Sequence, residues 1–208
     1  MRDDGYIQHP VRCLFPAFET TVGYAVTGRI RTGAPPISNI CYYQRTDWWE
    51  YVAGFPSPKI LVLADVDHAP GTGAFVGEIH AEIGRALGCV GYVTNGVVRD
   101  LPALERNGFQ CFASGVCVSH AYGHIVDFGE PVEIGSQKIV PGDILQGDRH
   151  GVLSIPGGIT AAQLAGAVLA IQERERELIG LCRAADFSLE KLVAMLVKGV
   201  SCPPQNHR

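Results

Sequence analysis

The stretch that decides the fold lies between Lys59 and Thr94 and reads, without its loop, "KILVLADV" (59–66), "VGEIHAEIGRALG" (76–88) and "CVGYVT" (89–94). The first and last segments have the length and the β-branched content of buried strands. The segment between them has the apolar spacing of a helix. A strand, a helix and a second strand in this order predict a βαβ unit, with parallel strands and a right-handed crossover.

The helix of this unit is predicted from about Glu78 to Leu87, and Gly88 ends it. Its apolar stripe recurs every fourth position, at Phe75, Ile79, Ile83 and Leu87. Ten helical residues span about 15 Å and five strand residues about 17 Å, so the helix and the returning strand nearly cancel in height. Glu78 and the pair Arg99–Asp100 are therefore expected at one edge of the sheet, where open α/β sheets bind ligands.

The rest of the chain mixes the two kinds of element. Strand patterns occur at 21–30, 108–115, 124–134 and 151–156, and helical spacing at about 101–107 and 160–182. The segment "VPGDILQGDRHGVLSIP" (140–156) predicts a hairpin. We therefore expect an α/β fold mixed with antiparallel β, in which helices flank a mixed sheet or partial barrel. Glycine and proline are spread through the chain, which favours one domain over 1–208.

Composition excludes several classes of function. The net charge is −4 and no block of lysine or arginine occurs, so binding to nucleic acid is disfavoured. No secretory signal and no apolar run of membrane-spanning length is visible, so we expect a cytoplasmic protein that does not bind membranes. The seven cysteines are scattered, and they predict reduced, mostly buried thiols; four lie in or beside apolar runs, at 89, 111, 117 and 182.

The expected edge has the chemistry of a site for a small anion and a metal. A carboxylate such as Asp100 suits a hard divalent cation, Mg²⁺ or Mn²⁺. The helix start favours an anionic group, and Arg99 would oppose the charge of a substrate oxygen. Structural roles are alternatives: Asp100 could cap the helix that follows it, Arg99 could pair with Glu105, and Glu78 could stabilise a helix N-terminus.

Five segments in order resemble the RraA-like family, which includes 4-hydroxy-4-methyl-2-oxoglutarate/4-carboxy-4-hydroxy-2-oxoadipate aldolases and the regulator of ribonuclease E activity. They are "VGYAVT" (22–27), "ILVLADV" (60–66), "VGEIHAEIGRALGCVGYVTNGVVRD" (76–100), "SHAYGHIVDFGEPVEIG" (119–135) and "VPGDILQGDRHGVLSIP" (140–156). The resemblance covers residues 22 to about 182 and leaves 183–208 as a helical tail. It implies a layered α/β/α domain similar to the phosphohistidine swivelling β/β/α fold, and trimers or hexamers with sites between subunits.

The resemblance also implies roles for the charged residues. In the family's aldolases an acidic residue, twenty intervening positions and Arg-Asp form a motif, and here Glu78 stands where the family normally has Asp. By this resemblance Asp100 binds the divalent metal, Arg99 contacts the pyruvyl oxygen, and Glu78 orders a water molecule.

Two further contributions follow from the same resemblance. Backbone groups near Gly77, Ile79 and His80 would receive the substrate carboxylate. The family recruits a glutamate from the C-terminal helix of a neighbouring subunit, and Glu175 is the candidate because it interrupts the apolar stripe of the predicted helix at 160–182. Glu173 is the alternative, and a structural ion pair of Glu175 within a helix contact is an equally open interpretation.

The implied reaction is a class II retro-aldol cleavage of a 4-hydroxy-2-oxoacid to pyruvate, with oxaloacetate decarboxylation as a side activity. The motif contains no lysine for a Schiff base, which agrees with metal use. The alternative is a non-catalytic regulator that masks a ribonuclease or another protein. A methyltransferase is disfavoured, because no glycine-rich nucleotide loop follows the first strand. His120 and His124 are given no chemistry and are expected to have polar or core-edge roles, and His150 is expected to be solvated in a turn.

Overall fold

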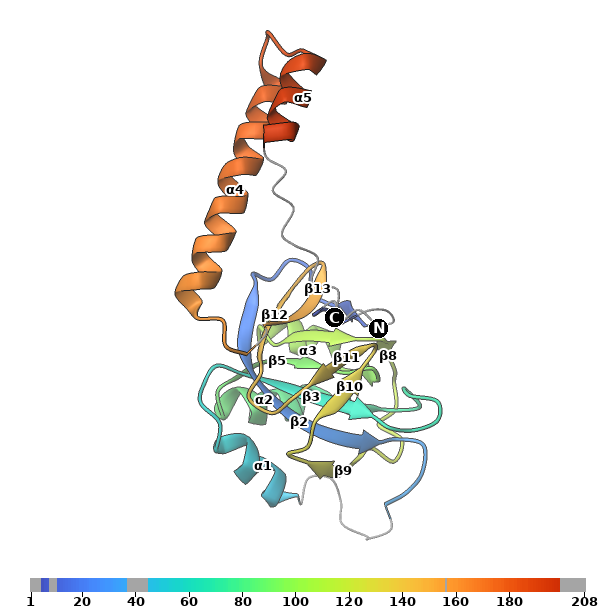
Figure 1. Ribbon diagram of the computed structural model, residues 1–208. Coiled ribbons are helices and arrows are strands. Elements are labelled where there is room, and N and C mark those ends of the chain that lie inside the picture. Colours follow the sequence, from blue (N-terminus) through green and yellow to red (C-terminus); the bar gives the residue numbers. More distant parts are fainter. Residues whose placement is uncertain (1–4, 8–10, 37–44, 156, 199–208) are drawn as a thin grey trace. The chain divides into compact units, whose positions relative to one another are not determined.

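The computed structural model describes residues 5–7, 11–36, 45–155 and 157–198, and the chain forms two compact units, 1–157 and 158–208. The first unit contains all the strands described here, and the second consists of two helices (Figure 1). The expectation of one domain over 1–208 stays a prediction.

The first unit is built on a mixed eight-stranded sheet. Seven strands follow the order β1-β7-β5-β3-β2-β12-β13, and β9 pairs with the C-terminal part of β2, from Gly28 to Arg31. Strands β2, β3, β5 and β7 are parallel to one another, and the others are antiparallel to their neighbours. The bounds are β1 Arg12–Cys13, β2 Thr21–Arg31, β3 Lys59–Asp65, β5 Cys89–Val93, β7 Gln110–Ala113, β9 His124–Phe128, β12 Ile144–Asp148 and β13 Gly151–Ile155. The predicted α/β fold with a mixed sheet or partial barrel is confirmed.

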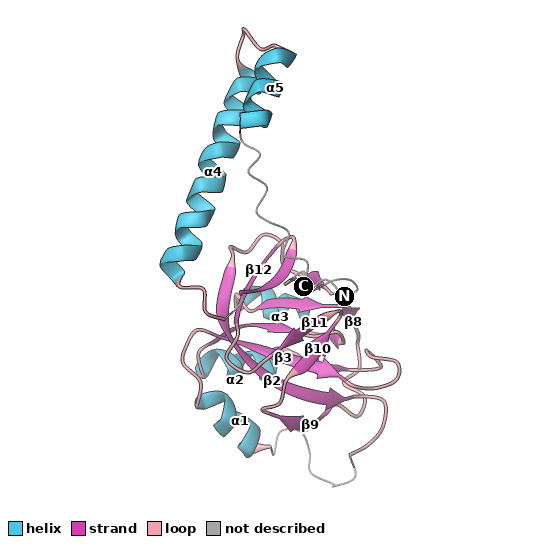
Figure 2. Ribbon diagram, in the orientation of Figure 1, coloured by secondary structure: helices cyan, strands magenta, loops and turns pink. Residues whose placement is uncertain are grey.

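Strand β3 lies in the middle of this sheet, and all its residues are buried. Because side chains alternate along a strand, its residues enter two separate cores. Leu61 and Leu63 pack among side chains of the helices, whereas Ile60 and Val62 pack with a small antiparallel hairpin on the other face. The helices are α1 Thr46–Ala53, α2 Glu78–Ala86 and α3 Leu101–Arg106, and the hairpin is β10 Val132–Ile134 with β11 Gln137–Ile139 (Figure 2). The unit therefore has three layers.

A second sheet of three very short parallel strands stands beside the first. It pairs β4 (Ala74–Val76) with β6 (Val97–Val98), and β6 with β8 (Gly115–Val116). The sequence patterns did not predict these strands, because two or three residues are too few to show an alternation. They matter for the site, since β4 leads directly into α2 and β6 leads directly to Arg99.

Two predicted elements differ from the structure in their details. Helix α2 has nearly the predicted bounds, but the expected stripe is wrong: Phe75 belongs to β4, and Ile79 is 52% exposed. The helix instead buries His80, Ala81 and Gly84. The strand predicted at 124–134 is interrupted and forms β9 and β10, which lie in different sheets.

The second unit is a helical hairpin of α4 (Ala161–Arg183) and α5 (Leu189–Lys198). Helix α4 has almost the predicted bounds and begins with a capping box, in which the hydroxyl of Thr160 accepts a hydrogen bond from the backbone N–H of Gln163. None of its residues is buried. The residues after 198 lie outside the described part of the chain.

The cysteines follow the prediction in part. Cys89 and Cys111 are buried and Cys117 is half-buried, but Cys182 on α4 is exposed, contrary to the expectation from its apolar neighbours. Cys41 and Cys202 lie outside the described residues. In the described ranges, no helix combines the length and the apolar character needed to cross a membrane.

Candidate active site around Asp100

Strands β4 and β6 bring the two ends of the acidic–Arg-Asp motif together. Val76 pairs with Val98 in the parallel ladder, and the backbone N–H of Arg99 donates to the carbonyl oxygen of Val76 at 3.2 Å. Gly77 and Arg99 therefore leave neighbouring strands at the same end. The predicted convergence of Glu78 with Arg99 and Asp100 thus occurs in the main chain, through β4 and β6 rather than through the larger strands β3 and β5.

The Asp100 carboxylate is tied to the start of α2. Its Oδ2 accepts a hydrogen bond from the backbone N–H of Glu78 at 3.0 Å, and Arg99 Nε lies 3.5 Å from the same oxygen. Within the described part of the chain, the other carboxylate oxygen has no hydrogen bond. The side chains of Arg99 and Asp100 are 31% and 37% exposed, so both reach solvent.

Gly77 is required by this close approach. A Cβ atom at this position would lie 2.4 Å from Asp100 Oδ2 and 3.0 Å from Arg99 Nε. Gly77 has extended backbone angles that any residue can adopt, so glycine is needed here for space and not for conformation. A role for its backbone in receiving a substrate carboxylate stays a prediction.

Asp100 has a left-handed backbone conformation, with φ of 58°. It occupies the N-cap position of α3, but its side chain makes no capping hydrogen bond. The capping role considered from the sequence is therefore wrong for the carboxylate, which turns to α2 instead. Left-handed backbone is costly for residues other than glycine and occurs often at functional sites.

The Glu78 carboxylate makes a different contact from its own backbone. Its Oε1 lies 3.7 Å from Nη2 of Arg106 on α3, and both side chains are more than half exposed. In the described residues the Glu78 carboxylate has no ion pair with Arg99. The sequence offered no signal for Arg106, because its position relative to Glu78 depends on how α2 and α3 pack together.

His80 lies two positions after Glu78 on α2 and is buried beside two aromatic rings. Its imidazole is 4.6 Å from the ring of Phe75 and 5.9 Å from that of Trp49, between ring centroids. Burial, with a smaller effect from the positive charge of Arg99, lowers the pKa of His80 to about 4. The ring is therefore neutral at physiological pH, and a role for its backbone N–H in substrate binding stays a prediction, as it does for Ile79.

The glycine-rich loop before β4 is held by the chain itself. The backbone N–H of Gly71 donates to the carboxylate of Asp65 at 2.8 Å, and a Cβ on Gly73 would lie 2.6 Å from that of Ala121. Asp65 is buried, and its burial raises its pKa. Both glycines thus lie close to other groups of the protein.

The three histidines considered from the sequence contact nearby groups. His120 Nδ1 lies 2.8 Å from the carbonyl oxygen of Ala121, and His124 Nδ1 lies 2.7 Å from that of Tyr122. His150, in the turn between β12 and β13, is 3.3 Å from Asp148. These contacts agree with polar and local roles.

Glu175 and its alternative Glu173 are exposed on α4, in the second unit. The expected contribution of Glu175 to a neighbouring subunit's site stays a prediction. Neither residue has an ion pair with another described residue, so the interpretation of Glu175 as half of an ion pair within this helical hairpin has no support.

The residues around Asp100 suit a metal site that has few protein ligands. Among the described residues, no group of three or more His, Cys, Asp or Glu side chains could hold a metal ion together. Mg²⁺, however, is often bound through one or two carboxylates while it keeps several waters. Asp100 fits such a site, since its carboxylate reaches solvent and one of its oxygens has no hydrogen bond to the described chain.

The family of the chain follows from a comparison with known proteins. The RraA-like family model, described as Aldolase/RraA, matches residues 2–154. The chain belongs to the RraA-like family. The resemblance inferred from the sequence segments is thereby confirmed, and the family contains both aldolases and regulators of ribonuclease E.

One curated relative of the chain comes from Halalkalibacterium halodurans and bears the name "Putative 4-hydroxy-4-methyl-2-oxoglutarate aldolase". The two proteins are 32% identical over 104 residues, which is 49% of each chain. The match thus spans about half the length of that relative.

Two solved structures show that this RraA-like protein shares its fold with known proteins. A protein of Pseudomonas syringae pv. tomato is 21% identical with a TM-score of 0.71, and the match covers 91% of this chain and 82% of that one. RraAS2 of Streptomyces coelicolor, described as an unusual member of the RNase ES inhibitor RraA family, is 20% identical with a TM-score of 0.64, over 83% and 82% of the two chains. At these identities the likeness concerns the fold alone.

Proposed function

We propose that this RraA-like protein is a divalent-metal-dependent lyase that cleaves a 4-hydroxy-2-oxoacid, such as 4-hydroxy-4-methyl-2-oxoglutarate, to pyruvate. The observation that carries the proposal is the exposed Arg99–Asp100 pair, held at the N-terminus of α2 by the hydrogen bond from Glu78 N. A cation, a guanidinium and a helix start together would suit an anionic 2-oxoacid. The aldolase name of the curated relative points in the same direction.

Asp100 would hold the cation, Mg²⁺ or Mn²⁺, through its carboxylate. When bound there, the cation supplies a Lewis acid for the substrate carbonyl. Arg99 would bind the 2-oxo oxygen and stabilise the negative charge that develops on it, because a guanidinium is always positive and donates in a fixed geometry. Backbone N–H groups of the first turn of α2, near Gly77, Ile79 and His80, would receive the substrate carboxylate.

In the reaction the bond between C3 and C4 of the substrate breaks. The 4-hydroxyl group loses its proton and becomes a carbonyl, while the electron pair of the broken bond passes to the pyruvate enolate, which is then protonated at C3. A carboxylate would accept the hydroxyl proton through an ordered water, and Glu78, whose backbone N–H bonds to Asp100, is the candidate. It could do so only after its side chain leaves Arg106. Loss of CO₂ from oxaloacetate gives the same enolate, so decarboxylation is an expected side activity.

The test is pyruvate release from 4-hydroxy-4-methyl-2-oxoglutarate and from oxaloacetate, with and without added Mg²⁺. We expect metal-dependent turnover by the wild type and loss of turnover in Asp100→Ala. The matched control is Asp143→Asn, because Asp143 also accepts one backbone hydrogen bond, from Val140 N at 2.8 Å, and lies outside the site. Turnover that is independent of metal, or that survives in Asp100→Ala, would refute the proposal.

A second candidate is a non-catalytic regulator that binds and masks a ribonuclease or another protein. The observation that favours it is that the Glu78 carboxylate pairs with Arg106 and not with Arg99. In the described chain, Asp100 is then the one carboxylate that pairs with Arg99. Inactivity toward both oxoacids, together with tight binding to a ribonuclease, would support this candidate.

The proposal also covers the oligomeric state of the protein and its place in the cell. We propose a cytoplasmic homotrimer or homohexamer in which Glu175 of a neighbouring subunit approaches the Asp100 site. Loss of activity in Glu175→Gln, recovered when this variant is mixed with inactive Asp100→Ala subunits, would support a shared site. A mixture no more active than the two variants measured separately would contradict it.

A further inference from the structure

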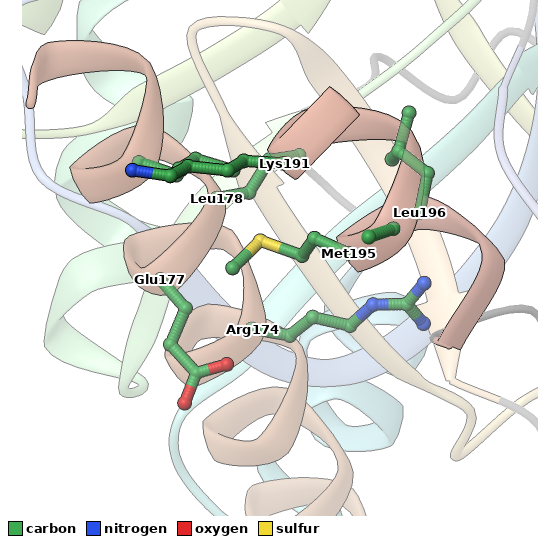
Figure 3. A pocket seen from close by; sticks show the side chains of 8 residues that line it. Arg174, Glu177, Leu178, Lys191, Met195 and Leu196 are labelled. Atoms are coloured by element: carbon green, nitrogen blue, oxygen red, sulfur yellow. The ribbon is translucent and has the colours of Figure 1, made fainter. Parts of the chain in front are cut away.

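Two groups of polar side chains lie outside the acidic–Arg-Asp motif. In the second unit three exposed charged side chains border a groove of about 580 Å³ between α4 and α5, and Figure 3 shows them; they are Arg174, Glu177 and Lys191. In the first unit Asp65 and Thr32 are buried, with exposed fractions of 3% and 0%. Exposed charges are screened by water and salt, whereas buried polar groups are held in place by hydrogen bonds. The buried group is therefore the one that can fix the position of the chain around it.

Asp65 ends the central strand β3 and contacts the chain segment that enters β6. The side chain of Asn95 holds the main chain of Asp65 on both sides: its Oδ1 accepts from the Asp65 N–H at 2.7 Å, and its Nδ2 donates to the Asp65 carbonyl oxygen at 2.9 Å. The next residue, Gly96, lies so close that a Cβ atom there would be 3.3 Å from Asp65 Oδ2. Since β6 begins at Val97, both contacts are made at its entrance.

The carboxylate of Asp65 also contacts the chain segment that enters β4. Its Oδ2 accepts a hydrogen bond from the backbone N–H of Gly71 at 2.8 Å. The hydroxyl of Thr32 lies 3.3 Å from the same oxygen and accepts a hydrogen bond from the backbone N–H of Gly73 at 3.2 Å. Because Gly73 directly precedes β4, one buried carboxylate supports the entrance of this strand through Gly71 and through Thr32.

The neighbouring carboxylate of Asp67 supports a different segment. Its Oδ2 accepts hydrogen bonds from the backbone N–H groups of Thr32 and Gly33, both at 2.7 Å, and lies 3.4 Å from the Thr32 hydroxyl. Thr32 and Gly33 follow the end of β2. Asp67 thus holds the chain after β2, and Asp65 holds the chain before β4 and before β6.

The entrances of β4 and β6 matter because these strands are very short. They have three and two residues, which span about 10 Å and about 7 Å. Few hydrogen bonds of their own fix their positions, so a shift at the entrance is passed on to Gly77 and Arg99 at the other end. The entering segments also touch each other, since a Cβ atom on Gly71 would lie 3.1 Å from Cγ1 of Val97.

We propose that Asp65 is a positioning residue for the Asp100 site. Its carboxylate holds the entrances of β4 and β6 together, and this sets the contact between the backbone N–H of Glu78 and the Asp100 carboxylate. In this role Asp65 acts through the main chain and does not touch the substrate. Its effect on turnover rests on the function proposed above, whereas its effect on the main chain does not. A misplacement of about 1 Å at a reacting group can lower a rate by about a hundredfold.

Hydrogen exchange of backbone amides in the full chain tests this positioning without any substrate. Asp65→Ala leaves the N–H of Gly71 and the hydroxyl of Thr32 without this acceptor, so the amides of Glu78 and Arg99 should exchange at least about tenfold faster. Amides of the ladder between β2 and β12 should keep the wild-type rates. Thr32→Val keeps the shape of the side chain and removes the hydroxyl, and it should accelerate the same two amides at least about threefold. It decides the question if Asp65→Ala does not fold.

The control for a general loss of stability is Val62→Ala, on the same strand as Asp65. Val62 is buried and packs with the β10–β11 hairpin on the other face of the sheet. This variant should unfold at a lower temperature, while the exchange rates of the Glu78 and Arg99 amides stay within about twofold of the wild type. Equal acceleration of these amides in Val62→Ala and Asp65→Ala would overturn the proposal. Wild-type exchange rates in a folded Asp65→Ala would do so as well.

Pyruvate release is the second readout. In an active enzyme Asp65→Ala should lower kcat at least about tenfold, and Val62→Ala should keep kcat within about twofold of the wild type where both are folded. An active enzyme whose kcat is unchanged in Asp65→Ala would overturn the role of Asp65 at the site. A wild type without turnover would refute the function proposed for Asp100, and the exchange rates alone would then decide the role of Asp65.

Discussion

The backbone N–H of Glu78 donates a 3.0 Å hydrogen bond to the Asp100 carboxylate, although the two residues are 22 positions apart in the chain. The contact uses the main chain of one residue and the side chain of the other. Space for it exists because residue 77 is a glycine.

The first prediction concerns this space. Gly77→Ala should lower pyruvate release by at least about tenfold, because the added Cβ would displace the Asp100 carboxylate and a small misplacement of a catalytic group is costly. The backbone angles of Gly77 suit alanine, so the fold should persist. Gly166→Ala on α4 is the control, since nothing lies within 4 Å of its Cβ position; it should leave turnover unchanged and stabilise the helix by up to about 1 kcal/mol.

The left-handed backbone of Asp100 gives a second prediction. Asp100→Asn should unfold at nearly the wild-type temperature, because asparagine tolerates this conformation, but it should lose metal-dependent turnover. Asp100→Val should lose turnover and also about 1–3 kcal/mol of stability, because a β-branched residue is strained at this φ. Thermal unfolding and the pyruvate assay separate the two effects. Equal stability of the two variants would contradict the role given to the backbone.

A third prediction concerns the pH dependence of stability. The pKa of His80 is about 4 in the folded protein, below its ordinary value of 6.5, so the unfolded chain binds a proton that the folded one does not. The contribution of this histidine to the free energy of unfolding is complete above pH 6.5. As the pH falls from 6.5 toward 4, that free energy decreases by up to about 3 kcal/mol.

Urea unfolding at several pH values between 4.5 and 7.5 measures this effect. His80→Phe keeps a ring in contact with Phe75 and Trp49 but cannot titrate, so its stability should depend less on pH over this interval than that of the wild type. The same slope in both proteins would show that His80 does not accept the proton on unfolding.

The fourth prediction concerns Arg106. The pair of Arg106 with Glu78 is exposed, so Arg106→Gln should change the stability by less than about 1 kcal/mol. If Glu78 works beside Asp100, release of its carboxylate should raise turnover by a few-fold, whereas Arg106→Lys, which keeps the charge, should resemble the wild type. Turnover that falls in Arg106→Gln would instead indicate that Arg106 itself binds the substrate.

The sequence predicted those helices and strands that are long enough to show a clear apolar run or a helical repeat. The strands β3 and β5 and the helix α2 follow from apolar runs and a helical repeat, and the bounds of α4 follow from its spacing. Helix α1 was missed because its eight residues begin after Arg45 without a side-chain cap. The strands β4, β6 and β8 are too short for any periodicity, although β4 and β6 align the motif.

The site was predicted to the level of the main chain and not to that of the side chains. Chain geometry brought residue 78 to Arg99 and Asp100, as expected. The direction of the Glu78 carboxylate depends on Arg106, which comes near only when α2 and α3 pack, and no local pattern encodes that contact. Ile79 is exposed for a related reason: the residue that seemed to begin its stripe, Phe75, belongs to a strand.

The registry of β4 with β6 has a consequence for how such proteins diversify. Hydrogen bonds between main-chain groups hold residues 77 and 99 side by side whatever side chains surround them. Substitutions at 78, 99 or 106 can therefore create or abolish a catalytic site while the backbone of β4 and β6 stays unchanged. A scaffold of this kind is compatible with both aldolases and regulators in one family, because the chemistry depends on a few side chains and the architecture beneath them can stay the same.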